Sequence, residues 1–164
     1  MTGPETVESI SFEDFYLLHH RRLVGALSVA VGFSAAEDAV QEAFIEANVR
    51  WSRVSRTREP VAWVRRVAIN RLIDGGRRRA RHTRALARLD SPGDAVDRHH
   101  DHELAQAVAA LPDRQRLAVA LYYLLDLPVV EVAELLGVSE GTIKSNLHDA
   151  RSALRLQLQV VDDG

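Results

Sequence analysis

Residues 129–147 read VVEVAELLGVSEGTIKSNL, and this stretch has the layout of a helix-turn-helix. Ala133 is small at the point where two helices would cross, and Gly137 supplies a turn residue that tolerates a positive φ. Ser139 is suited to cap the second helix, and Ile143 would fill the small core between the two. The stretch therefore predicts two helices joined by a tight turn, an arrangement that reads the major groove of DNA.

The second helix of this motif would present polar side chains near its amino-terminal end. Its apolar positions, Leu147, Ala150 and Leu154, recur at helical spacing and mark the buried face. On the opposite face such a helix meets base edges in the major groove, although a plain helical hairpin would share part of the pattern. The predicted DNA contacts are Glu140, Thr142, Lys144, Ser145, His148 and Arg151.

Charge is distributed unevenly along the chain, although the net charge is only −2. Residues 1–49 carry eight acids and two Arg, whereas residues 50–88 carry thirteen Arg and two acids. Residues 103–164 are acidic again, with nine acids and five bases. Apolar residues recur throughout the basic block, which favours a folded basic surface over a disordered tail. Such a segment is typical of nucleic-acid contact.

Helical periodicity runs through most of the chain, and no sheet is needed to explain the apolar pattern. Ser34 and Glu37 read as a capping box, Pro60 suits the first position of a helix, and Gly75 with Gly76 predicts a bend or an end. The predicted helices cover about 12–31, 34–51, 60–73, 103–110, 113–126, 129–136 and 139–158.

The stretch from residue 89 to 102, LDSPGDAVDRHHDH, has the turn residues and the acidity of an exposed linker. We therefore expect an all-α chain with two small helical domains joined by an acidic flexible linker. The expected boundaries are a disordered tail at 1–11, a first domain at 12–82, the linker at 83–102, a second domain at 103–158 and a tail at 159–164.

Four side chains share one face of the second predicted helix, beside its apolar stripe: Asp38, Gln41, Glu42 and Ile45. The spacing alone is compatible with a solvated acidic surface or with a docking face for a basic partner. A metal site fits poorly, because neither His nor a third carboxylate stands at ligand spacing. These alternatives stay open on the residues alone.

Several classes of protein find no support in the composition. The absence of Cys excludes a disulfide framework and fits a reducing cytoplasm. No stretch approaches the ~20 apolar residues of a membrane span, and residues 1–11 lack the apolar run of a signal peptide. No nucleophile–base pair or phosphate-binding loop stands out, and the linker histidines have no further ligands beside them. We therefore expect a cytoplasmic, non-enzymatic protein without a cofactor or bound metal.

Three further runs precede the helix-turn-helix in a characteristic order: AEDAVQEAF at 36–44, AWVRRVAINRLID at 62–74 and LPDRQR at 111–116. With them the chain resembles the extracytoplasmic-function (ECF) group of bacterial sigma factors over about residues 12–156. The resemblance implies a subunit that binds core RNA polymerase, recognises minus-ten and minus-thirty-five promoter elements and helps to melt DNA. The alternative, a stand-alone helix-turn-helix transcriptional regulator, explains only the second half.

The resemblance also implies roles for the first domain. The acidic face with Asp38 and Glu42 would dock on the clamp helices of the polymerase's largest subunit. The third helix and the loop at 53–59 match the part that binds the minus-ten element, and Asn70 aligns with a position in the pocket for a flipped base. Trp63 suits the core and base stacking equally well. The residues expected at this element are Trp63, Arg65, Arg66, Asn70, Arg71, Arg77 and Arg78.

In the second domain, the helix-turn-helix matches the reader of the minus-thirty-five element, and the domain would also touch the polymerase flap. The acidic linker would occupy the RNA-exit path, and an anti-sigma factor is a further candidate partner. Two departures from the family stand out. Gly75 and Gly76 replace large helix formers, and Asn146 and Asp149 stand where relatives often carry Arg. We therefore expect few phosphate contacts from this domain.

Overall fold

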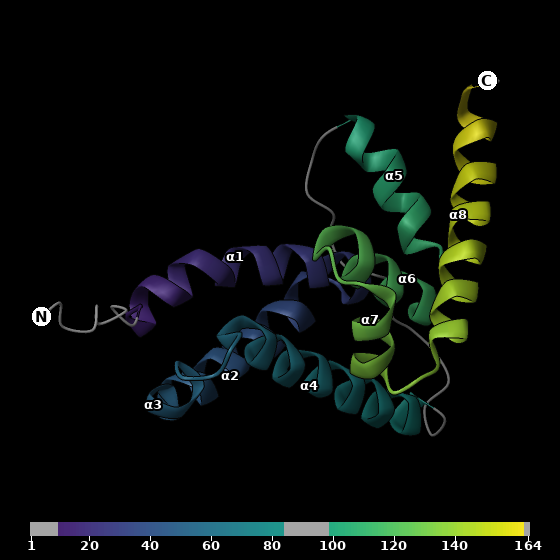
Figure 1. Cartoon of the computed structure of the whole chain (residues 1–164). Coiled ribbons are helices and arrows are strands. Elements are labelled where there is room, and N and C mark those ends of the chain that lie inside the picture. The colour runs from purple at the N-terminus through teal and green to yellow at the C-terminus, as the bar shows by residue number, and fades with distance from the viewer. Residues whose placement is uncertain (1–9, 84–98, 163–164) are drawn as a thin grey trace, which may run out of the picture.

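The computed structural model describes residues 10–83 and 99–162, and every regular element in these ranges is a helix, which confirms the all-α prediction. Figure 1 shows two groups of helices, with α1 extending from the first group to the second. The elements are α1 (Phe12–Val31), α2 (Phe33–Val49), α3 (Trp51–Val54), α4 (Pro60–Thr83), α5 (His99–Ala109), α6 (Asp113–Val119), the π-helical turn η1 (Ala120–Leu124), α7 (Val129–Leu136) and α8 (Glu140–Asp162).

The predicted amino-terminal tail and linker fall largely on residues 1–9 and 84–98, which lie outside the described residues, as do residues 163–164. The predicted tail at 159–164 is wrong up to Asp162, because α8 continues to that residue. The helix α5 begins at His99, within the segment predicted as linker. None of the described helices combines the length and the apolar content that crossing a bilayer requires.

The helices α1, α2 and α4 build the first half around a common apolar core. Their inward positions follow the helical period, so each helix contributes a stripe to the same interior. At most 1% of the surface of each of these side chains is exposed: Leu27, Val40, Phe44, Val64 and Ile69. Trp51 of α3 adds an aromatic contact, with its ring centroid 4.9 Å from that of Phe15. This packing fixes the positions of α2 and α4 relative to one another.

Two details of the helix boundaries differ from the sequence prediction. The N-cap of α2 is Gly32, and no side chain caps the helix, so the capping box at Ser34 and Glu37 is wrong. The reason is that Gly32 (φ 85°) also ends α1, which leaves no segment between the helices for a cap. Of the bend or end predicted at Gly75 and Gly76, the end is also wrong, because α4 continues to Thr83. Good helix formers on both sides offset the cost of the glycines, about 1 kcal/mol each relative to Ala.

The helix-turn-helix forms as its sequence predicts. Gly137 ends α7 in the left-handed conformation, with φ 65°. The Thr142 backbone N–H donates to Ser139 Oγ at 3.1 Å, so Ser139 caps the first turn of α8. Ile143 and Leu147 are buried in the small core between the two helices. The segment before the motif differs from the single predicted helix, because the α-helix α6 gives way to the π-helical turn η1.

The two halves of the chain pack against each other, which the sequence did not predict. The helix α1 contacts α5, α6 and η1, and α4 contacts α7. Arg65 of α4, with 8% of its side chain exposed, pairs with Glu131 of α7. At the surface, Arg22 pairs with Asp126 at 3.1 Å. These contacts join segments that are 66 and 104 residues apart in the sequence.

Candidate functional site

The helix α2 presents its acidic face to solvent. All four predicted docking residues are exposed on it: Asp38, Gln41, Glu42 and Ile45. The Tyr16 hydroxyl donates to Gln41 Oε1 at 3.4 Å and ties this face to α1. Val49, which is 81% exposed, continues the face one turn beyond Ile45. The sequence analysis missed Val49, although its i+4 spacing from Ile45 is a signal that could have found it.

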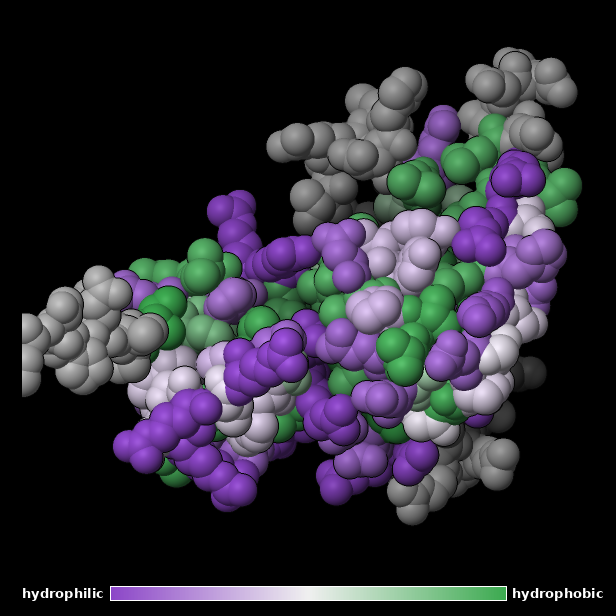
Figure 2. Space-filling model, in the orientation of Figure 1, coloured by the Kyte–Doolittle hydropathy of each residue, from purple (hydrophilic) through white to green (hydrophobic). Residues whose placement is uncertain are grey.

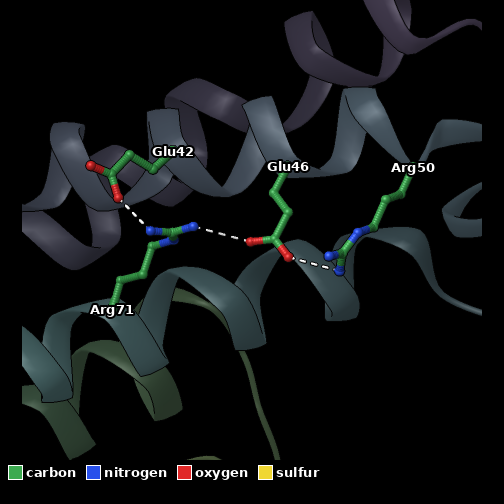
Figure 3. A network of polar contacts seen from close by, with 4 residues as sticks. All are labelled: Glu42, Glu46, Arg50 and Arg71. Atoms are coloured by element: carbon green, nitrogen blue, oxygen red, sulfur yellow. Dashed lines mark hydrogen bonds and ion pairs between the residues drawn. The ribbon is translucent and has the colours of Figure 1, made fainter.

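A chain of ion pairs joins the acidic face to the basic helix α4 (Figure 3). The Arg71 guanidinium lies between two carboxylates of α2, with Nη1 2.6 Å from Glu42 Oε2 and Nη2 3.0 Å from Glu46 Oε2. The second oxygen of Glu46 lies 2.8 Å from Arg50 Nη1. Glu46 was not among the predicted site residues, because its partner Arg71 comes from a different helix.

Most of the residues predicted to bind DNA through α4 lie on its surface. Figure 2, drawn in the orientation of Figure 1, shows hydrophilic side chains over α3 and α4. Trp63 is half-buried and packs against the core, which favours its structural interpretation. The exposed members of the set are Arg66, Asn70, Arg71, Arg77 and Arg78. Because these residues are spread along one helix, they can follow a nucleic-acid backbone.

Arg65 differs from the other predicted DNA-binding residues of α4. Its side chain is 8% exposed and is paired with Glu131. In this arrangement the guanidinium faces the second half of the chain and cannot reach DNA. Glu131 itself was missed by the sequence analysis, since nothing in the helix-turn-helix pattern links that position to α4.

The amino-terminal part of α8 displays the predicted recognition residues. Only Thr142 is half-buried, and its hydroxyl lies 2.9 Å from Ser139 Oγ. The other predicted contacts are exposed: Glu140, Lys144, Ser145, His148 and Arg151. Lys144 Nζ is 3.9 Å from the Glu140 carboxylate, a pair exposed enough to be worth at most about 1 kcal/mol. Lys144 can therefore leave Glu140 for a phosphate or a base edge at little cost.

Two charged residues of α8 lie on this part of the helix: Arg151, which is a predicted DNA contact, and Asp149, which is not. The Arg151 guanidinium donates to the Tyr123 hydroxyl at 3.1 Å, which ties α8 to η1. Asp149 is exposed on α8, where it adds a negative charge to a surface that would approach phosphates. Among the described residues, no group of three or more side chains comes together in a way that could hold a metal ion.

Comparisons with known proteins match both halves of the chain. Residues 15–82 match the family described as Sigma-70 region 2, and residues 101–154 match Sigma-70, region 4. The ECF RNA polymerase sigma factor SigW of Bacillus subtilis is 31% identical over 76% of this chain and 75% of its own length. The ECF RNA polymerase sigma factor SigL of Mycobacterium tuberculosis is 36% identical over 82% of this chain and 80% of its own.

Solved structures support the fold. The sigma factor RpoE of Bartonella quintana, solved in complex with the anti-sigma factor NepR, has a TM-score of 0.74 at 24% identity, covering 91% of this chain and 97% of that one. CnrH, solved with the cytosolic domain of CnrY, has a TM-score of 0.58 at 22% identity, covering 91% of this chain and 88% of its own. From its two matched regions and its ECF relatives, the chain belongs to the extracytoplasmic-function group of RNA polymerase sigma factors.

Proposed function

We propose that this chain binds core RNA polymerase, recognises the minus-ten and minus-thirty-five promoter elements and helps to initiate transcription. One observation carries the proposal. This member of the family has an exposed acidic face on α2, a basic helix α4 beside it and a helix-turn-helix, all on the same chain. A stand-alone helix-turn-helix regulator would leave the first two without a purpose. The role is that of a specificity subunit in the cytoplasm, without a catalytic step of its own.

The acidic face of α2 is the proposed contact with the clamp helices of the polymerase's largest subunit. Its carboxylates, Asp38 and Glu42, suit basic side chains of the partner, and Ile45 offers an exposed apolar contact. Charged groups of this kind mainly set the rate and the specificity of association, whereas buried apolar contacts hold a complex together. A face that carries both is therefore suited to a partner with a basic and partly apolar surface.

The exposed side of α4 is the proposed contact with the melted minus-ten element. Arg66, Arg77 and Arg78 supply positive charge for the phosphates, and Asn70 can hydrogen-bond the edge of an extruded base. Flipping a base costs a few kcal/mol, which contacts of this kind must recover. Single-stranded DNA would thus be held by charge along the helix and read at the position of Asn70.

The helix α8 is the proposed reader of the minus-thirty-five element, and its domain is the proposed contact with the polymerase flap. An anti-sigma factor is a further proposed partner, since the structurally similar RpoE was solved together with NepR. Family membership supports the flap contact, and the exposed recognition residues, Lys144 among them, also support the role of α8.

Run-off transcription tests the proposed function. Core polymerase is combined with this chain on a library of GC-rich promoter fragments, and the transcripts are sequenced. We expect discrete start sites that require the chain and that share two sequence elements upstream. A library that yields the same transcripts with and without the chain contradicts the proposal. Tight promoter binding by the chain without polymerase would favour a stand-alone regulator instead.

A charge exchange in α8 tests the minus-thirty-five assignment. In holoenzyme, Asp149→Arg is expected to strengthen binding to duplex upstream DNA across sequences, because it replaces a repulsive charge with an attractive one. Each added phosphate contact should steepen the slope of log affinity against log salt by about 0.9. Lys144→Ala should reduce promoter-specific transcription and leave core binding intact. Salt titrations of DNA binding measure the effect of Asp149→Arg. Run-off transcription and a titration with core polymerase measure the effect of Lys144→Ala.

The control for this charge exchange is Glu103→Arg, which makes the same change on the exposed surface of α5. It should leave the salt slope unchanged. Equal slopes for Asp149→Arg and wild type would show that Asp149 does not face the DNA.

A further inference from the structure

Arg71 belongs to two proposed sites at the same time. It lies on α4 among the residues proposed to bind the minus-ten element. In the structure, however, both of its terminal nitrogens contact carboxylates of α2, at 2.6 Å from Glu42 and 3.0 Å from Glu46 (Figure 3). Glu42 in turn is one of the proposed contacts with polymerase. A single guanidinium therefore joins the docking face to the DNA-binding helix.

We propose that Arg71 couples these two sites by changing partners. Glu42 holds Nη1 of Arg71 while the acidic face is empty. When a basic side chain of the polymerase pairs with Glu42, that nitrogen is released and becomes available to a phosphate of the minus-ten strand. The inference rests on the proposed function, because it uses both of the sites assigned there.

The surroundings of Glu42 provide room for such an exchange. A hollow of about 320 Å³ opens beside the ion pair. It is lined by Ser34, Ala35, Asp38, Ala39, Glu42, Arg71 and Leu72. The Glu42 side chain is 58% exposed and that of Arg71 is 40% exposed, so a partner can reach both ends of the pair. Two carboxylates in one hollow suit the cationic end of a Lys or Arg side chain.

Glu46 makes the exchange inexpensive. It keeps Arg50 as a second partner at 2.8 Å, and its side chain is only 28% exposed. If Arg71 turns toward DNA, neither carboxylate is left without a counter-ion, since Glu42 has its new partner and Glu46 retains Arg50. Exposed pairs of this kind change an equilibrium constant by about two- to fivefold, which is small enough for a competitor to overcome.

When Arg71 changes partners, only side chains move, and the backbones of α2 and α4 stay in place. The helices α2 and α4 share the core of the first half through Val40, Phe44 and Ile69, all of which are buried. Tightly packed interiors do not deform gradually, so the distance between the two backbones is fixed. By thermodynamic linkage, the factor by which bound polymerase raises the affinity for DNA equals the factor by which bound DNA raises the affinity for polymerase.

The first test measures the free chain with a labelled 12-nucleotide oligo-dT at low salt, which needs no knowledge of the promoter. Glu42→Gln should bind about two- to fivefold more tightly than Glu37→Gln, a control that removes the same charge from the same helix without touching Arg71. The salt slope should steepen by about 0.7 for one additional phosphate contact on a single strand. In the double variant Glu42→Gln with Arg71→Ala, this gain should disappear.

Three outcomes of this test would overturn the coupling. They are equal affinities for Glu42→Gln and Glu37→Gln, a gain that survives Arg71→Ala, and no measurable binding by Glu42→Gln at low salt. Because this measurement uses the free chain, its result does not depend on whether the chain binds core polymerase.

The second test measures core binding without DNA. Arg71→Ala removes the competitor for Glu42 and should tighten the complex with core polymerase by about two- to fivefold. Arg21→Ala, which removes one positive charge from the exposed surface of α1, is the control and should not tighten it. Weaker binding by Arg71→Ala, or the same affinity as Arg21→Ala, would overturn the coupling. If wild type itself does not bind core, the proposed function fails, and the coupling fails with it.

Discussion

Reversing both carboxylates of the docking face, with Asp38→Lys and Glu42→Lys together, should weaken binding to core polymerase by roughly a hundredfold or more. Placing like charges opposite each other across an interface costs several kcal/mol, and each 1.4 kcal/mol is a factor of ten in affinity. The fold should tolerate the change, because both side chains are exposed. Among the described residues, the change removes only the pair between Glu42 and Arg71, and exposed pairs are worth at most about 1 kcal/mol.

The measurement is a polarisation titration of the labelled chain with core polymerase, together with a thermal melt. The control is Glu103→Lys with Glu134→Lys, which makes the same change of charge on exposed residues of the second half. If the two double variants lose the same affinity, the effect is one of overall charge. If Asp38→Lys with Glu42→Lys binds core as wild type does, the docking assignment is incorrect.

Glu131→Ala is expected to separate the two halves of the chain. It leaves the Arg65 guanidinium, with 8% of its side chain exposed, without a carboxylate. Breaking a buried pair in this way costs about 3–5 kcal/mol, and the partial exposure of Glu131 lowers the expected loss to about 2–3 kcal/mol. The chain can avoid this cost by opening, because water then hydrates Arg65. We therefore expect an increase in the radius of gyration in small-angle scattering, with helix content unchanged.

Two further variants make the result of Glu131→Ala specific. Glu134→Ala removes an exposed carboxylate from the same helix and should leave the radius of gyration unchanged. Replacing both partners, with Arg65→Leu and Glu131→Leu, should restore the compact form, since apolar side chains often substitute for a buried ion pair without loss. A compact Glu131→Ala chain would mean that apolar packing of α1 against the second half suffices by itself.

The sequence predicted those features that depend on near neighbours in the chain. Ser139 caps α8 and Gly137 ends α7 because the helix-turn-helix pattern specifies both within a few residues. The acidic face of α2 was also visible, since residues at i, i+3, i+4 and i+7 share a face of any helix. The assignment of that face to polymerase needed the family resemblance, because the spacing alone does not identify a partner.

Features that depend on distant residues or on small energy differences were missed. The pair between Arg65 and Glu131 spans 66 positions, and no local pattern specifies it. The same holds for Glu46, whose role depends on Arg71 from another helix. The continuation of α4 through Gly75 and Gly76 reflects a sum over the whole helix, in which two unfavourable residues are outweighed. Single residues are therefore weak evidence for where a long helix ends.

The contact between α4 and α7 also has a consequence for the length of DNA that the chain can span. By their names, the two promoter elements lie about 25 base pairs apart, which is about 85 Å of straight duplex at about 3.4 Å per base pair. Because α7 contacts both α4 and α8, these two helices lie too close together in this arrangement to reach both elements on such a duplex. If α4 and α8 read these elements as proposed, only the separated form binds a complete promoter. Each 1.4 kcal/mol that favours the contact then lowers the apparent affinity of the free chain for a complete promoter by about tenfold.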